Sequence, residues 1–143
     1  MTLGDAPPRS PGWKIAVDDP DSSRHKYLML HNLGIGTSGD AYQHVDVNGR
    51  RYSHVVNPSD GMGVSNSLST TVLAPDGITA DALALGLSIL PVSEALRVAD
   101  SIEGVSVTLL RRVGSEVRHF SSRRFPRVLE PAVQVRSLES GEK

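Results

Sequence analysis

The alternation of apolar and polar positions along this chain predicts short strands separated by turns, with two helical segments in the middle. Trp13 to Val17 alternates as a strand does, and Tyr27 to Leu33 is an apolar run that suits a strand or one helical turn. Ser67 to Ala74 is rich in β-branched residues and predicts a further strand, which ends at the turn Pro75-Asp76-Gly77. The mixture of strands and helices predicts an α+β fold, with a mixed or antiparallel sheet packed on two helices.

The dipeptide Asn48-Gly49 predicts a tight hairpin, because both central residues of a two-residue turn adopt positive φ. Its arms are Gln43 to Val47 and Arg50 to Val56. The second arm places His54 near its end, and Asn57-Pro58 ends the strand because proline has no N–H to donate.

A second hairpin is predicted from Val105 to Val113 and Glu116 to Phe120, around Gly114-Ser115. Earlier in the chain, Gly34 to Gly39 contains three glycines, and we expect a strand end that breaks into a tight loop.

The first predicted helix runs from Ala80 to Leu90, with Thr79 at the N-cap position. Apolar or small residues lie on nearly all its sides, which predicts a helix buried all round. Pro91 ends it, and Ser93 is expected to cap a second helix that continues through Ile102.

The 143 residues suit one domain with a core that needs no disulfides. Fifteen Lys and Arg against sixteen Asp and Glu give a formal net charge of -1, so the chain lacks the basic surface of nucleic-acid-binding proteins. The absence of cysteine excludes disulfide scaffolds, thiolate metal sites and cysteine nucleophiles.

The longest apolar run, Ala80 to Leu90, is about eleven residues, against roughly twenty for a membrane-spanning helix. Prolines stand where a signal peptide would have its apolar stretch, so we expect a cytoplasmic protein from these residues. The expected organisation is a disordered lead-in at 1–12, a domain at 13–138 and a polar tail at 139–143.

Asp81 is the residue whose charge most needs an explanation, because it lies at the start of an apolar helix. Taken alone, a carboxylate here favours the helix dipole as a capping residue. In a buried setting, a role as a metal ligand or as part of a phosphate site explains the charge better.

His54 alone is more often a structural histidine than a catalytic one. Gly34, Gly36 and Gly39 could cradle a phosphate, but a tight turn explains them equally well.

The remaining candidates are interpreted as structural. No spacing among the other histidines suggests zinc, and no elbow motif surrounds Ser38. These histidines are His25, His31, His44 and His119. Two arginine pairs are expected to face solvent, although paired arginines could also contact a pyrophosphate. They are Arg111-Arg112 and Arg123-Arg124.

Four ordered motifs together carry a resemblance to a known family. They are Thr37 to Asp40 (TSGD), Asn48 to Pro58 (NGRRYSHVVNP), Ala74 to Gly77 (APDG) and Thr79 to Ala84 (TADALA). In this order they resemble the FAD:protein FMN transferases, the ApbE-like family. The resemblance covers roughly Trp13 to Arg118 and only the C-terminal half of a usual member, which implies the corresponding half of that family's fold.

Members of that family use magnesium to split FAD and attach FMN through a phosphoester to a Thr or Ser of a target flavoprotein, and many are exported and membrane-anchored. The resemblance therefore implies phosphoryl transfer, with FAD as substrate and Mg²⁺ as cofactor. Asp81 matches the family's metal-binding carboxylate, and His54 matches a motif histidine expected to touch the diphosphate or assist proton transfer. Ser38, Gly39, Asp40 and Asn57 match cofactor-binding positions.

Two departures from the family pattern leave alternatives open. The hydroxyl ligand that the family places one helical turn after its Asp is here Leu85, whose alkyl side chain cannot bind magnesium, and Ser88 is a further turn along. The family's N-terminal half also has no counterpart in these residues. The alternatives are a non-catalytic flavin- or nucleotide-binding homologue, a fragment that needs a separate N-terminal half, or a homo-oligomer.

Overall fold

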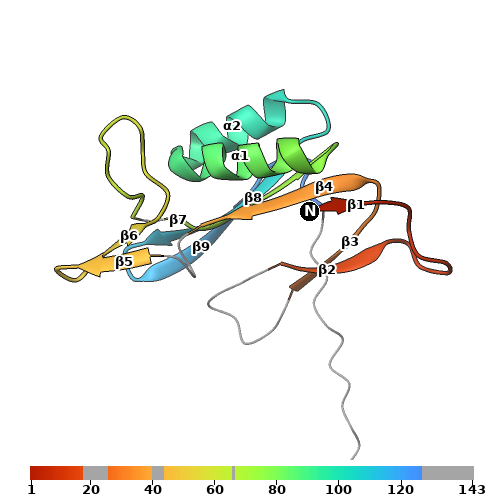
Figure 1. The fold of residues 1–143 in the computed structure, drawn as a ribbon, viewed down its shortest axis with the longest axis horizontal. Helices are drawn as coiled ribbons and strands as arrows, with labels where there is room; N and C mark the ends of the chain where they lie inside the picture. The colour runs from red at the N-terminus through yellow and green to blue at the C-terminus, as the bar shows by residue number, and fades with distance from the viewer. Residues whose placement is uncertain (18–25, 40–43, 66, 127–143) are drawn as a thin grey trace, which may run out of the picture.

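The computed structural model describes residues 1–17, 26–39, 44–65 and 67–126 (Figure 1). Within them, one antiparallel sheet has the strand order β1-β4-β7-β8-β9, with two further hairpins beside it. The strands of this sheet are β1 (Thr2–Leu3), β4 (Leu33–Ser38), β7 (Ser67–Ala74), β8 (Ser106–Val113) and β9 (Glu116–Ser121). The predicted α+β fold is confirmed, and the sheet is antiparallel throughout its described pairs.

Both helices, α1 (Gly77–Ile89) and α2 (Val92–Ser101), lie on one face of the sheet (Figure 1). The main core forms between them and the central strands β7 and β8. Its buried members are Val72, Ala74, Ala80, Ala84, Leu87, Ala95, Ala99, Val105, Val107 and Leu109. Because successive side chains of a strand point to opposite faces, the alternate residues of β7 are left for a second core.

The second core lies on the other face, where the hairpin of β2 (Trp13–Val17) and β3 (Lys26–Leu30) packs against the sheet. It joins Leu28 and Leu30 of the hairpin to Ile35 and Leu73 of the sheet. The predicted strand at Trp13–Val17 is confirmed. The predicted run from Tyr27 to Leu33 is divided between β3 and β4, at a bend where Asn32 has a φ of 50°.

The Asn48-Gly49 hairpin is confirmed, with β5 (His44–Val47) paired to β6 (Arg50–Ser53). Asn48 and Gly49 have φ values of 53° and 76°, as this turn requires. β6 ends at Ser53, so His54 follows the strand instead of lying within it. The β8–β9 hairpin is also confirmed, with Gly114 at a φ of 65°.

The predicted start of the first helix is wrong, because α1 begins at Gly77 and its N-cap is Asp76. The Asp76 carboxylate accepts the Thr79 backbone N–H at 2.8 Å and the Thr79 hydroxyl at 2.7 Å. An aspartate at this position satisfies an N–H that has no partner within the helix. Likewise α2 begins at Val92 after Pro91, and Ser93 lies inside it.

The expectation of a tight loop at Gly34 to Gly39 is wrong, because most of this segment is strand β4. Its glycines allow the first turns of α1 to approach the sheet. A Cβ on Gly34 would lie 2.1 Å from the Asp76 carbonyl oxygen, and one on Gly36 would lie 2.6 Å from the Ala80 carbonyl oxygen. The helix backbone thus occupies the space where a phosphate cradle was considered.

Part of the expected lead-in at 1–12 is ordered, since β1 pairs with β4 and Leu3 belongs to the second core. The tail at 139–143 lies outside the described residues. Neither of the two described helices has the length and apolar character needed to cross a membrane.

We predict that Gly36→Ala destabilises the fold by about 1–3 kcal/mol, because its methyl group would overlap backbone atoms of α1. The matched control is Gly86→Ala within α1, where an added Cβ has nothing within 4 Å. There the greater helix propensity of alanine should stabilise by about 0.5–1 kcal/mol. Urea unfolding of both variants measures the difference, and equal effects would contradict this packing role.

Candidate functional site

The helix α1 is buried on one side only, so the prediction of burial all round is wrong. Its buried residues are Ala80, Ala84, Leu87 and Ser88, and Ser88 donates its hydroxyl to the Leu85 carbonyl at 2.7 Å. The opposite side, which we call the outer face of α1, carries Ile78, Asp81, Ala82 and Leu85, all exposed. The cause is the close packing of α1 on β4, which turns the small residues inward.

Asp81 is therefore an exposed carboxylate, in contrast to the buried one that the sequence suggested. It forms no hydrogen bond or ion pair with any other described residue. It lines a hollow of about 520 Å³ at the start of α1, together with Met1, Thr2, Asp76, Gly77, Ile78 and Ala82. Because it caps no backbone N–H, its oxygens remain available to a ligand.

Asp76 lines the same hollow, but its oxygens are both in use. The backbone N–H and then the hydroxyl of Thr79 stabilise the charged carboxylate and lower the pKa of Asp76 below its ordinary value of 3.8. The stability that this cap contributes is present above the ordinary pKa and is lost as pH falls through the lowered one. Asp76 thus keeps a negative charge near Asp81 at neutral pH.

These residues fit magnesium in a limited way. Within the described ranges, no three His, Asp or Glu side chains gather as a metal site. Leu85, 48% exposed one turn after Asp81, presents an alkyl group where the family has a hydroxyl. Magnesium commonly keeps several waters and binds one or two carboxylates together with substrate phosphates. Asp81 is suited to be that one carboxylate.

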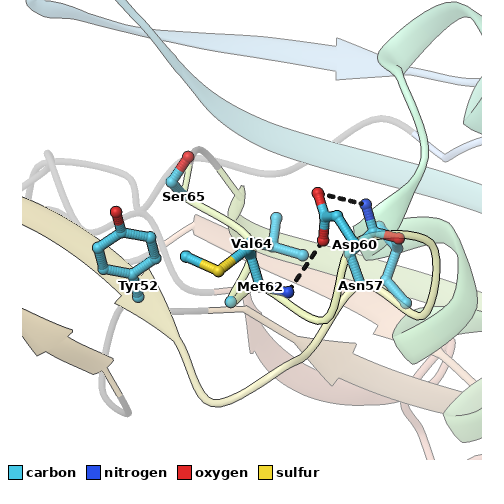
Figure 2. Close-up of a pocket in the computed structure, with 8 residues that line it drawn as sticks. Tyr52, Asn57, Asp60, Met62, Val64 and Ser65 are labelled. Atoms are coloured by element: carbon cyan, nitrogen blue, oxygen red, sulfur yellow. Dashed lines mark hydrogen bonds between the residues drawn. The ribbon is translucent and has the colours of Figure 1, made fainter.

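A second pocket lies at the other end of α1, beside the loop of residues 54–65 (Figure 2). It has a volume of about 410 Å³, and we call it the loop pocket. Its lining residues are Tyr52, Asn57, Asp60, Met62, Gly63, Val64, Ser65 and Ile89. Asn57 and Asp60 lie at one end of it in Figure 2, Tyr52 lies at the other, and Met62 lies between them with its side chain toward Tyr52.

The loop holds its own polar groups in place. The Asp60 carboxylate accepts the Met62 N–H at 2.9 Å, and the Asn57 side-chain oxygen accepts the Ser59 N–H at 3.0 Å. The Asn57 amide lies 3.5 Å from the other Asp60 oxygen. These short-range bonds are typical of Asx turns, in which a side chain replaces a backbone partner. They hold the conformation of the loop that forms one wall of the loop pocket.

The two hollows are joined by the outer face of α1, since Asp81, Leu85 and Ile89 follow one another at four-residue spacing. At a rise of 1.5 Å per residue, Asp81 and Ile89 are separated by about 12 Å along the helix axis. This arrangement favours an elongated ligand, which could contact Asp81 at one end and the loop pocket at the other.

The other predicted site residues are distributed around this line. His54 is exposed at the start of the loop, outside the loop pocket. Ser38 and Gly39 lie at the end of β4, and Ser38 shares the helix-facing side of that strand with Gly34 and Gly36. Asp40 lies outside the described residues. Asp81 thus lies near the start of α1, and Asn57 lies in the loop pocket at the end of the same helix. The predicted site residues do not form one cluster.

Of the eight residues that line the loop pocket, sequence reasoning named only Asn57 as a site residue. Only Asp60-Gly61 carried a signal, as a turn dipeptide within the loop. Tyr52 and Met62 are ordinary apolar positions in the sequence. Their proximity depends on the fold of the whole loop.

The expectation that the two arginine pairs face solvent is confirmed for Arg112, Arg123 and Arg124, which are exposed, and is wrong for Arg111. Arg111 is 3% exposed and donates to the Leu87 and Ser88 carbonyls, both at 3.3 Å, and to the Thr70 hydroxyl at 3.1 Å. Arg124 donates to three carbonyls near the end of α2, those of Ala99, Ile102 and Val105. Arg123 pairs with Asp100 at 3.2 Å.

We expect Arg111→Met to destabilise the fold by about 1–3 kcal/mol, because it leaves the last carbonyls of α1 without buried partners. The neighbouring Arg112 is exposed on the same strand, so Arg112→Met should change stability by less than about 0.5 kcal/mol. Chemical denaturation measures the free energy of unfolding of both variants. A small effect of Arg111→Met would show that its guanidinium does not hold the end of α1.

The fold and the site define an α+β domain with an exposed helix carboxylate and an adjoining polar pocket. The model of the ApbE family matches residues 1–109, so the chain belongs to the ApbE family. A FAD:protein FMN transferase of Haemophilus influenzae is 33% identical over 123 residues, and one of Escherichia coli is 30% identical over 117 residues. These alignments cover 82% and 79% of this chain.

Solved structures agree with this assignment. The apo form of the Pseudomonas stutzeri flavinyl transferase ApbE superposes with a TM-score of 0.70 at 27% identity, covering 85% of this chain and 38% of that one. The flavin transferase ApbE of Vibrio cholerae gives a TM-score of 0.66 at 29% identity, over 78% of this chain and 36% of that one. The chain therefore spans about a third of the length of its relatives.

Proposed function

We propose that this chain forms the magnesium- and FAD-binding part of an FAD:protein FMN transferase, which transfers FMN from FAD to a Thr or Ser of a target flavoprotein. The observation that carries this proposal is the placement of Asp81 and the loop pocket at two ends of one exposed helix face. FAD is an elongated dinucleotide, and such a line of contacts suits its shape. The names of the relatives support the same reaction.

In this reaction the acceptor hydroxyl oxygen attacks the phosphorus on the riboflavin side of the diphosphate. The bond from that phosphorus to the bridging oxygen breaks, AMP leaves, and FMN remains on the acceptor as a phosphoester. The hydroxyl proton passes to a base, a role we assign to His54, which is exposed at the start of the loop. Bound magnesium supplies neutralisation of charge on the phosphate oxygens.

The chain's own residues mainly orient the substrate. Asp81 presents its carboxylate at one end, and Asn57 and Ser65 offer polar groups at the other. Asp60 and Asn57 each accept a backbone N–H and so shape the loop, while the Asn57 amide has a second N–H to donate besides the one that faces Asp60. Phosphoryl transfer depends largely on positioning, and a helix held at both ends meets that need.

We expect Asp81→Ala to weaken FAD binding in the presence of magnesium by about tenfold or more, with little effect when magnesium is absent. Leu85→Thr restores the hydroxyl that the family has at this position, so it should strengthen FAD binding when magnesium is present. Glu103→Gln, a change at an exposed carboxylate that does not line the hollow of Asp81, serves as the control. Titration of FAD with and without magnesium measures all three variants, and an unchanged affinity of Asp81→Ala rejects its role as a ligand.

A second candidate function is flavin or nucleotide binding without transfer, or transfer only after a further polypeptide completes the domain. It is favoured by Leu85 and by Ile78, which is 86% exposed on the outer face of α1. The length of the relatives that this chain does not span could supply the covering surface. Incubation with FAD, magnesium and an acceptor flavoprotein separates the candidates: bound FAD beside an unmodified acceptor favours the second one.

A further inference from the structure

The hairpin β5–β6 carries an apolar groove that none of the functional residues above explains. Ten large hydrophobic side chains are exposed among the described residues, and four of them line this one hollow of about 330 Å³. These four are Val45 (64% exposed), Val47 (48%), Val56 (54%) and Met62 (51%), and Tyr52 also lines the hollow. We call it the valine groove. Exposed apolar side chains that gather in this way mark binding surfaces.

The pairing of the hairpin explains how the groove arises. Val45 lies directly opposite Tyr52, and Val47 is two residues further along the same strand, so all three point to one side. His44 and Asp46 alternate with them on the other side, where the His44 Nε2 lies 3.8 Å from the Asp46 carboxylate. The hairpin is thus amphipathic, but its apolar side faces the groove instead of a core.

The valine groove continues into the loop pocket, because Tyr52, Met62 and Gly63 line both. In Figure 2, Tyr52 lies at the end of the loop pocket away from Asn57 and Asp60, and the side chain of Met62 points toward it. A ligand in the groove would therefore lie next to the apolar end of the pocket. Two substrates that react with each other must be bound at adjoining sites, as the groove and the loop pocket are.

The edges of the hairpin limit what can bind. Next to β6, the Ser53 N–H donates to the Val64 carbonyl at 2.8 Å, so the loop covers that side. The groove itself is open to solvent, because Val45, Val47 and Val56 are all exposed. An extended peptide can place alternate apolar side chains into such a groove. The lining carries no charged residue, which disfavours a phosphate-bearing ligand here.

We infer that the valine groove binds the acceptor polypeptide, as an extended segment in which the reactive Thr or Ser is flanked by aliphatic side chains. This inference rests on the proposed transferase function and adds the site of its second substrate. The aliphatic flanks fill the groove, and the hydroxyl faces the loop pocket. The acceptor oxygen then reaches the riboflavin-side phosphorus of FAD, with AMP as the leaving group.

The test uses the full chain and a dye-labelled synthetic peptide, in which one Thr is flanked on each side by Val and Leu. Fluorescence polarisation measures its binding to wild type, Val45→Lys and Val113→Lys. Val113 is 43% exposed at the end of the other hairpin, so it is a matched control. We expect Val45→Lys to weaken binding by about tenfold and Val113→Lys to leave it unchanged. A peptide with Asn and Ser in place of Val and Leu should bind more weakly to wild type.

Titration with FAD is run on the same three proteins, because Val45 does not line the loop pocket. Equal FAD affinities beside selective loss of peptide binding support the inference. Peptide binding without FAD binding supports the groove as a peptide surface while it contradicts the transferase function. No peptide binding by wild type, or equal binding by Val45→Lys, overturns the inference. It is also overturned if light scattering shows a dimer that Val45→Lys dissociates, since a second copy then covers the groove.

Discussion

The contact between the backbone of α1 and the glycines of β4 is the constraint on which the site depends. At Gly34 and Gly36 the helix lies so close that any side chain on the strand would overlap its first turns. This approach turns Ala80 and Ala84 toward the sheet and leaves Asp81 and Leu85 outside. A larger residue on β4 would lift the helix and change the direction of the carboxylate. The exposure of Asp81 on the outer face of α1 is thus a consequence of how small residues pack on the opposite side of the same helix.

The two ends of α1 are held by different interactions. At the start, Asp76 accepts two hydrogen bonds from Thr79 and remains charged. At the end, the buried guanidinium of Arg111 binds two carbonyls of the last turn and so ties the helix to β8. Each group satisfies backbone atoms that a helix leaves without partners at its termini. Asp76 and Arg111 together fix the position of α1. Asp81, the candidate metal ligand on this helix, therefore keeps its position relative to the loop pocket.

The molecule encloses apolar surface on both faces of its main sheet but leaves it open at the β5–β6 hairpin and along α1. In the main sheet, helices cover one face and the β2–β3 hairpin the other, which gives two cores. The β5–β6 hairpin has only two strands, and a hairpin of this size is marginally stable without a covering partner. The exposed valines and the exposed part of α1 lie on either side of the loop pocket. The proposed binding of a dinucleotide and a polypeptide uses these two surfaces.

The sequence by itself determined the elements whose signals are local. Asn48-Gly49 requires positive φ and so fixes a hairpin, and the β-branched run at Ser67–Ala74 fixes a strand. Four ordered motifs identified the family. Only the tertiary structure decided that the glycines of β4 receive a helix, that Asp81 is exposed, and that Arg111 caps a helix from a distant strand. The physical reason is that burial and hydrogen-bond partners depend on residues far apart in the chain, whereas turn and strand preferences depend on near neighbours.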